Sequence, residues 1–260
     1  MERKKKLSML QFLFCLPLGI GRWIGFSCTV IRSFSWEKSL IRSVYLQGYD
    51  IGVRSLSITV LTGIVSGIVL ALQSYYQLGM HGLSCAIGFF VVKSILVEIG
   101  PVLTALALSG KVSGAIAVFL GTLRMTEQVS AMKTLGENPL KYFALPRIIA
   151  GVLVMPVLVI IAIWSGILAG YGICRYVFQI PSRVYWSMTF GNVLFSDLLM
   201  VIIKSLVFGF IITSLGCYYG LAHHRRISGI TDVITAGMVA SYVSIVFINC
   251  VITTLFHVLC

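Results

Sequence analysis

The chain of 260 residues is 58% hydrophobic and 11% charged, and its mean hydropathy is +0.99. Soluble domains carry about 25% charged residues, so this composition excludes a soluble globular protein and predicts an integral membrane protein. The formal net charge of +12 does not indicate a nucleic-acid partner, because the basic residues stand between apolar runs rather than on one soluble basic face.

The chain starts with MERKKK, and the apolar stretch 7–31 that follows is interrupted by Pro17 and Arg22. This start is similar to a signal peptide but has no small-residue A-x-A cleavage site. We therefore expect residues 1–54 to form a cytoplasmic N-terminus, with 7–31 as an amphipathic elbow helix in the inner membrane interface.

Five long apolar regions follow one another along the chain. A membrane-spanning helix needs about 20 apolar residues, and continuous rather than alternating apolar runs predict helices instead of a β-barrel. The second region is about twice that length, so we expect it to cross the membrane up to about Gly110 and then continue as a cytoplasmic helix. The predicted fold is an all-α integral membrane protein with five transmembrane helices in one membrane domain, residues 55–260. The apolar regions cover about residues 55–78, 83–122, 147–172, 198–219 and 231–259.

The distribution of basic residues predicts the orientation of these spans. Residues 1–54, 111–147 and 220–230 carry nine, five and two Lys or Arg, whereas the loops on the other side carry only Arg175 and Arg183. Basic residues gather in cytoplasmic loops, so the N-terminus is predicted to be cytoplasmic. An additional span formed by the elbow stretch would invert all later loops against this tendency.

Small residues recur at helical spacing within the spans. Such small-xxx-small faces allow close helix approach where lipid provides no hydrophobic drive for association. They favour a tightly packed bundle and are compatible with a homodimer. The pairs are Gly63 with Gly67, Gly110 with Gly114, and Gly166 with Gly170.

Glu98 is the candidate site residue within a span, because a carboxylate in the membrane is costly and usually faces a cavity or a partner. Gly100 and Pro101 follow it, which predicts a kink with freed backbone groups. Two interpretations stay open: Glu98 lines a substrate cavity, or it forms a structural ion pair with Lys93 or Lys204. Lys93 is poorly placed for a pair within one helix, since five residues correspond to about 140° of rotation.

One long polar stretch, LRMTEQVSAMKTLGENPLKYFALPR, separates two spans at residues 123–147. Thr126 is a candidate N-cap and Gly136 a candidate C-terminal stop, which predicts a short helix over about residues 126–136. Val129, Met132 and Leu135 are expected on one apolar side. The segment is either a helix resting on the membrane surface or a helix that docks into a cytoplasmic partner.

The sequence contains no signature of a catalytic site. It has no GxxxxGK[ST] phosphate-binding pattern, no HExxH and no GxSxG. The seven cysteines form no CxxC pair and are expected to pack rather than to bind metal. We thus predict a non-enzymatic membrane protein without metal or cofactor of its own. The intramembrane charges suggest an ATP-independent carrier or channel as one interpretation.

The run EIGPVLTALALSGKVSGAIAVFLGTLRMTEQVSAMKTLGENPLKYFALPR, Glu98–Arg147, closely resembles the signature of MlaE (YrbE-type) permeases. Looser likeness extends over nearly the whole chain, including LQSYYQL at 72–78, YWSM at 185–188, IKSLVFG at 203–209 and ISGITDVITAGMVAS at 227–241. These permeases are the membrane subunits of MCE-associated ABC transporters.

The resemblance implies a homodimer in a bacterial inner membrane that moves phospholipid or a related lipid to or from an MCE-domain protein. A separate P-loop ATPase would bind ATP and Mg²⁺. The polar stretch would be the coupling helix that contacts this ATPase. The residues that match family positions there are Glu127, Gln128, Met132, Gly136 and Pro139.

The resemblance also implies a substrate cavity near Glu98, Pro101, Tyr75 and Tyr76. The two tyrosines are open to a second interpretation as aromatic anchors in the membrane interface. The chain departs from the family pattern at Lys111, where Arg is common, at Asn138, where Asp is common, and at Phe119, where an acidic residue is common. Lys111 keeps the charge but loses the bidentate fork of arginine.

Overall fold

The computed structural model describes residues 21–33, 38–79, 87–191, 193–221 and 230–259, and over these residues the protein is helical with no strand. Five helices in this described part are long and apolar enough to cross a membrane. The predicted all-α architecture with five spans is therefore confirmed. The candidate spans are Leu40–Leu78, Ile87–Met125, Leu140–Tyr176, Phe195–Leu221 and Thr231–Phe256.

The first three spans lie in long rods interrupted only by local changes of helical pitch. The first rod joins α2 to α3 through a 3₁₀ turn, Val53–Ser55, and the second joins α4, α5 and α6 through two π-helical segments, Ile95–Ile99 and Ser109–Ser113. A third π-helical segment, Leu140–Ala144, leads into α8. The helices are α2 (Lys38–Gly52), α3 (Leu56–Gly79), α4 (Ile87–Ser94), α5 (Gly100–Leu108), α6 (Gly114–Met125) and α8 (Leu145–Tyr176).

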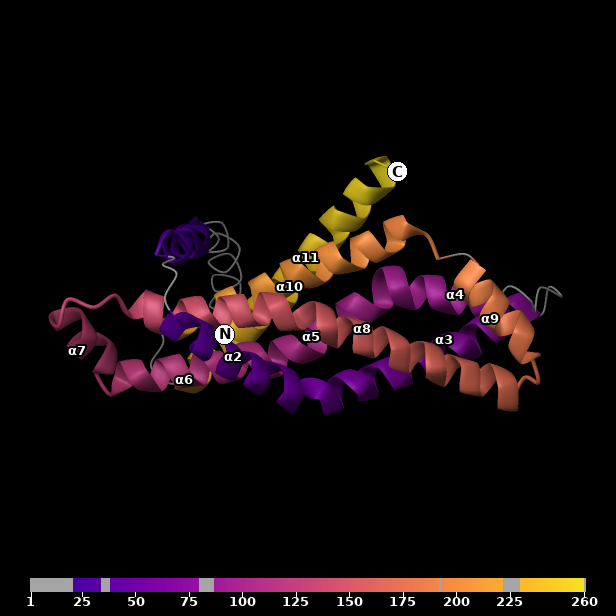
Figure 1. Ribbon diagram of the computed structural model, residues 1–260, viewed down its shortest axis with the longest axis horizontal. Helices are drawn as coiled ribbons and strands as arrows, with labels where there is room; N and C mark the ends of the chain where they lie inside the picture. The colour runs from indigo at the N-terminus through magenta and orange to yellow at the C-terminus, as the bar shows by residue number, and fades with distance from the viewer. Residues whose placement is uncertain (1–20, 34–37, 80–86, 192, 222–229, 260) are drawn as a thin grey trace, which may run out of the picture.

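The remaining helices complete the bundle and its two ends. Figure 1 shows α7 and α9 at opposite ends of the long axis, with the long helices between them. The helices are α7 (Gln128–Thr134), α9 (Ser182–Gly191), α10 (Phe195–Leu221) and α11 (Ile230–Leu259).

Tyr185 of α9 is buried and donates a hydrogen bond to the carbonyl of Ile167, 3.2 Å away. Burial raises the pKa of Tyr185, which keeps this donor protonated.

The helix that contains the first span begins at Lys38, well before residue 55, because α2 packs against α8 and buries Ile51. Residues 7–20 of the predicted elbow helix lie outside the described residues. The described residues 21–32 are helical and pack on α10, where the Trp23 indole donates a 3.1 Å hydrogen bond to Ser214.

Glycines bring α3 and α8 into close contact. A Cβ at Gly63 would overlap with the carbonyl oxygen of Ala162, and a Cβ at Gly67 with that of Gly166. The two predicted pairs, on α3 and on α8, thus face one another within one chain. Gly110 and Gly114 likewise face Tyr242 and Met238 of α11. Since these pairs pack spans of the same chain, they provide no argument for a homodimer.

We predict that Gly67→Ala destabilises the bundle by about 1–3 kcal/mol, because the new methyl group meets backbone that cannot rotate away. Thermal unfolding of the purified protein in detergent measures the effect. Gly172→Ala in α8 is the matched control, since a Cβ there meets nothing within 4 Å. Equal midpoints for the two variants would contradict the close packing of α3 on α8.

Candidate functional site: an intramembrane ion-pair cluster

Glu98 lies in a π-helical segment whose end is set by the next two residues. Gly100 is buried where a Cβ would press on the carbonyl of Ile95 and the side chain of Ile163. Pro101 has no N–H, so it cannot donate the usual helical hydrogen bond to the carbonyl of Val97. The Lys204 ammonium donates to this carbonyl instead, at 2.9 Å. The backbone group freed by proline is thus satisfied by a side chain of another span.

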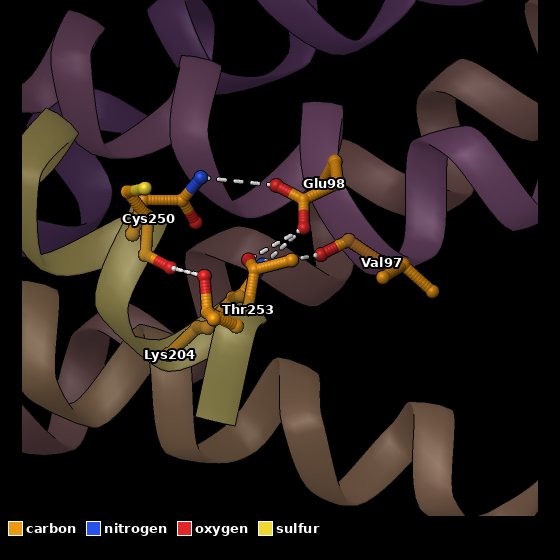
Figure 2. Close-up of polar contacts among 7 residues, drawn as sticks. Val97, Glu98, Lys204, Cys250 and Thr253 are labelled. Atoms are coloured by element: carbon orange, nitrogen blue, oxygen red, sulfur yellow. Dashed lines mark hydrogen bonds and ion pairs between the residues drawn. The ribbon is translucent and has the colours of Figure 1, made fainter. Parts of the chain in front are cut away.

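The Glu98 carboxylate receives hydrogen bonds from two other helices (Figure 2). Lys204 of α10 and Thr253 of α11 donate to Oε1 at 2.8 and 2.7 Å, and Asn249 of α11 donates to Oε2 at 3.0 Å. Lys204 is fully buried, while the Glu98 side chain is 36% exposed. The structure therefore contains the ion pair between Glu98 and Lys204 that one interpretation of the sequence allowed.

A second ion pair joins the same two spans. Lys93 of α4 donates to both carboxylate oxygens of Asp197, at 2.7 and 2.6 Å. Asp197 also accepts a hydrogen bond from the backbone N–H of Leu194, which precedes α10. Lys93 therefore pairs across helices rather than with Glu98.

The two ion pairs have opposite polarity along the spans. The α4–α5 rod contributes a cation and then an anion, while α10 contributes an anion and then a cation. Sliding one span along the other would separate both pairs and bring like charges closer, which is costly in a medium of low dielectric constant. The charges thus specify how α10 aligns with the second span.

A lateral groove of about 700 Å³ lies between α3, α5 and α11, and its wall includes Ile99, which follows Glu98 in sequence. Its lining is mostly apolar. Four residues that the sequence assigned to a substrate cavity, Glu98, Pro101, Tyr75 and Tyr76, are not part of its wall. The lining includes Leu61, Val65, Val69 and Gln73 of α3, Leu103 and Ala107 of α5, and Tyr242 of α11.

The two tyrosines lie near the C-terminal end of α3. Tyr75 stacks on Phe178 with ring centroids 3.5 Å apart and rings inclined by 7°. Tyr76 is 68% exposed. Tyr75 is therefore held by an aromatic neighbour, while Tyr76 is accessible at the surface of the chain.

The predicted coupling segment contains a helix, but it is shorter than expected. α7 covers seven residues, and its N-cap is Glu127 in a left-handed conformation with φ of 58°. The prediction of Thr126 as N-cap is wrong, because its hydroxyl donates back to the carbonyl of Thr122 and thereby continues the last turn of α6. Gly136 follows the helix with φ of +81°, a conformation that favours glycine.

The side chains of the segment divide between solvent and a cleft. Glu127, Gln128 and Gly136 are exposed, Met132 is half-buried and Pro139 is buried. Leu135 is 80% exposed, so the expected apolar side is only partly covered. Behind α7 lies a cleft of about 340 Å³ that α7 shares with the helix 21–32 and the end of α10.

Sequence reasoning missed three residues that contact the charged side chains: Asn249, Thr253 and Asp197. Asn and Thr are recognised as partners of a carboxylate only when they lie close to it in space. The sequence does not show which residues of different spans are close together. Asp197 could have been found, since an acidic residue at the start of an apolar region implies a basic partner.

The family to which the chain belongs follows from comparison with known proteins. The model of the family "Permease MlaE" matches residues 44–255. The chain belongs to the MlaE permease family. This confirms the family expected from residues 98–147. Together with its five apolar helices, membership of this family makes the protein a multi-pass membrane permease.

Named relatives of the chain are also permease proteins. A probable ABC transporter permease protein of Rickettsia felis is 35% identical over 237 residues, covering 91% of this chain and 92% of the relative. The intermembrane phospholipid transport system permease protein MlaE of Haemophilus influenzae is 32% identical over 214 residues, covering 80% of each chain. A probable ABC transporter permease protein of Synechocystis is 31% identical over 199 residues, covering 76% of each chain.

We predict that Lys204→Met lowers the free energy of unfolding by about 3–5 kcal/mol, because it leaves a carboxylate without its cation inside the membrane domain. The double variant Glu98→Gln with Lys204→Met should recover much of this loss, since both charges are gone. Unfolding titrations in detergent compare them, with the exposed Lys133→Met as control. Additive losses in the double variant would show that the two charges do not interact.

Proposed function

We propose that this permease is the membrane subunit of an ABC complex that moves phospholipid or a related lipid between a bacterial inner membrane and an MCE-domain partner. The observation that carries the proposal is membership of the MlaE family, in which the Haemophilus influenzae relative is named for intermembrane phospholipid transport. The fifty-residue match at 98–147 supports it, because that run contains both the intramembrane carboxylate and the cytoplasmic helix.

In this proposal a separate P-loop ATPase binds ATP and Mg²⁺ and docks on α7. The chain lacks a phosphate-binding pattern of its own. Glu127 caps α7 and Gln128 begins it, and both residues are exposed. The helix is connected to the second and third spans. Movement of an ATPase docked there would shift both spans as a hinge or shear motion. The N-terminus would be cytoplasmic, in agreement with the distribution of basic residues.

The active form would be a homodimer, with the exposed side of α11 as the contact. Only 11% of the most apolar window of α11 is buried within the chain, against 61% for α10. Val243, Phe247 and Cys250 lie along one exposed side at helical spacing. This side is separate from the glycine contacts, which are used within the chain.

The competing idea of an ATP-independent carrier drew its support from charges inside the spans. Lys93, Glu98, Asp197 and Lys204 form two ion pairs, so these charges neutralise one another. They therefore do not require a transported ion as a partner.

Native mass spectrometry of the complex, extracted gently after expression at natural levels, tests the proposal. We expect two copies of this chain with two P-loop ATPase subunits, an MCE ring and bound phospholipid. A chain that repeatedly emerges without an ATPase would overturn the ABC assignment and favour the carrier.

We predict that Glu98→Gln slows lipid transport severalfold while expression stays unchanged. Glutamine can still bond to Asn249 and Thr253, but it leaves the buried Lys204 ammonium without a counter-charge. ATP-dependent lipid transfer in proteoliposomes measures the rate, and thermal unfolding of the same preparation reports any loss of folded protein. Glu137→Gln, at an exposed position, is the control. Full transport by Glu98→Gln would remove Glu98 from the transport mechanism.

A further inference from the structure

The lateral groove has the length of an acyl chain in one leaflet. Along α3 it extends from Leu61 to Gln73, which is about 18 Å of helix. One leaflet of the hydrocarbon core is about 15 Å thick. The hydroxyls of Thr62 and Ser66 in its wall donate to carbonyls of their own helix, so the groove presents an apolar surface to its occupant.

Two basic residues meet at the cytoplasmic end of the groove. The Lys111 ammonium donates a hydrogen bond to the backbone carbonyl of Arg54, so these residues from two rods lie at the same depth. Arg54 precedes Leu61 by seven residues, about two helical turns, and Lys111 follows Ala107 by four residues, about one turn. Both cations therefore lie one to two helical turns beyond the groove wall along their rods.

The polar end contains more than the two cations. Tyr242 lines the groove, and its hydroxyl lies 2.8 Å from the point that a Cβ of Gly110 would occupy, directly before Lys111 in sequence. Asp50 contacts the Arg54 guanidinium at 3.3 Å, so Asp50, Arg54 and Lys111 together carry a net positive charge. The Arg54 side chain is 72% exposed and is open to an anion.

We propose that this groove binds a phospholipid of the cytoplasmic leaflet, with the phosphate at Arg54 and Lys111 and an acyl chain along α3 and α5. Lys111 is about 6 Å of helix beyond Ala107, and the headgroup layer on each side of the hydrocarbon core is about 5–7 Å thick. The cations thus lie at headgroup depth when the groove lies in hydrocarbon. Tyr242 is positioned to donate to an ester or phosphate oxygen between them.

The charges favour a lipid over a second copy of the chain as the occupant. An apolar helix from a second copy would fill the groove but would leave the cationic end without an anion. A phospholipid satisfies both parts at once. Binding at this groove is independent of the transport proposed above, whereas its role as the place where cargo is loaded rests on that function.

Photo-crosslinking in intact membranes tests the site. The photoreactive residue p-benzoyl-phenylalanine replaces Val65, which lines the groove and is 52% exposed. After irradiation, the mass of the full chain identifies the adduct. We expect a phospholipid adduct, and its yield should fall about tenfold or more in Arg54→Gln with Lys111→Gln, since each basic residue near a membrane surface strengthens anionic-lipid binding about fivefold. Arg175→Gln, an exposed basic residue at the opposite end, should change nothing.

A second pair of variants keeps the test independent of the charge change. Ala107→Phe fills the groove and should abolish the adduct, while Ala115→Phe, at an exposed position outside the groove, should not. The same photoreactive residue at Leu153 on the exposed side of α8 reports bulk lipid and should be insensitive to every variant.

An adduct with a second copy of the chain, or a lipid yield at Val65 that no variant alters, would overturn the proposal. The assay requires no ATPase, so its result is separate from that of the native mass spectrometry. An adduct that depends on Arg54, Lys111 and Ala107 as expected, in a chain that never binds an ATPase, is a further combination of results. It would keep the lipid site and reject the transport assignment.

Discussion

The burial of one ammonium group constrains the centre of this membrane domain. Lys204 is fully inside the bundle, where an uncompensated charge is costly, so its partners must be in place. Glu98 supplies the counter-charge and Val97 supplies a carbonyl that Pro101 cannot bond. The π-helical segment and the proline of the second span are therefore linked to the fourth span by one requirement. The second pair, Lys93 with Asp197, repeats the arrangement with reversed polarity and holds the same two spans in one alignment.

Close backbone packing and charge pairing act together in this bundle. Glycines let α3 approach α8 to backbone contact, and Gly209 brings α10 equally close to the backbone of α8. The ion pairs then align α10 with the second span. α11 contributes Asn249 and Thr253 to the carboxylate yet leaves most of its apolar surface uncovered. The structure thus concentrates unsatisfied apolar surface on one span, the one that also closes the lateral groove.

Much of the fold could be predicted from the sequence, because span number follows from the length of apolar runs. The start of the first rod at Lys38 was missed, since α2 is amphipathic and its burial depends on α8, which composition does not show. Glu98 could be singled out from its isolation in an apolar run, but choosing Lys204 over Lys93 required knowing which helices are neighbours. The N-cap was misassigned to Thr126 because a threonine that bonds back to its own helix has the same local sequence as one that caps the next helix.

The position of the second π-helical segment has a mechanical consequence. The rod from Ile87 to Met125 is 39 residues long, about twice what one crossing of the membrane needs. A pivot at Ser109–Ser113 would divide it into a short arm, α6, of about 18 Å and a long arm of about 33 Å. Such a lever multiplies displacement and reduces force by the same factor, nearly two. A small movement delivered at α7 would therefore arrive at the far end of the rod as a larger movement with less force, which suits displacing a flexible chain rather than breaking a strong bond.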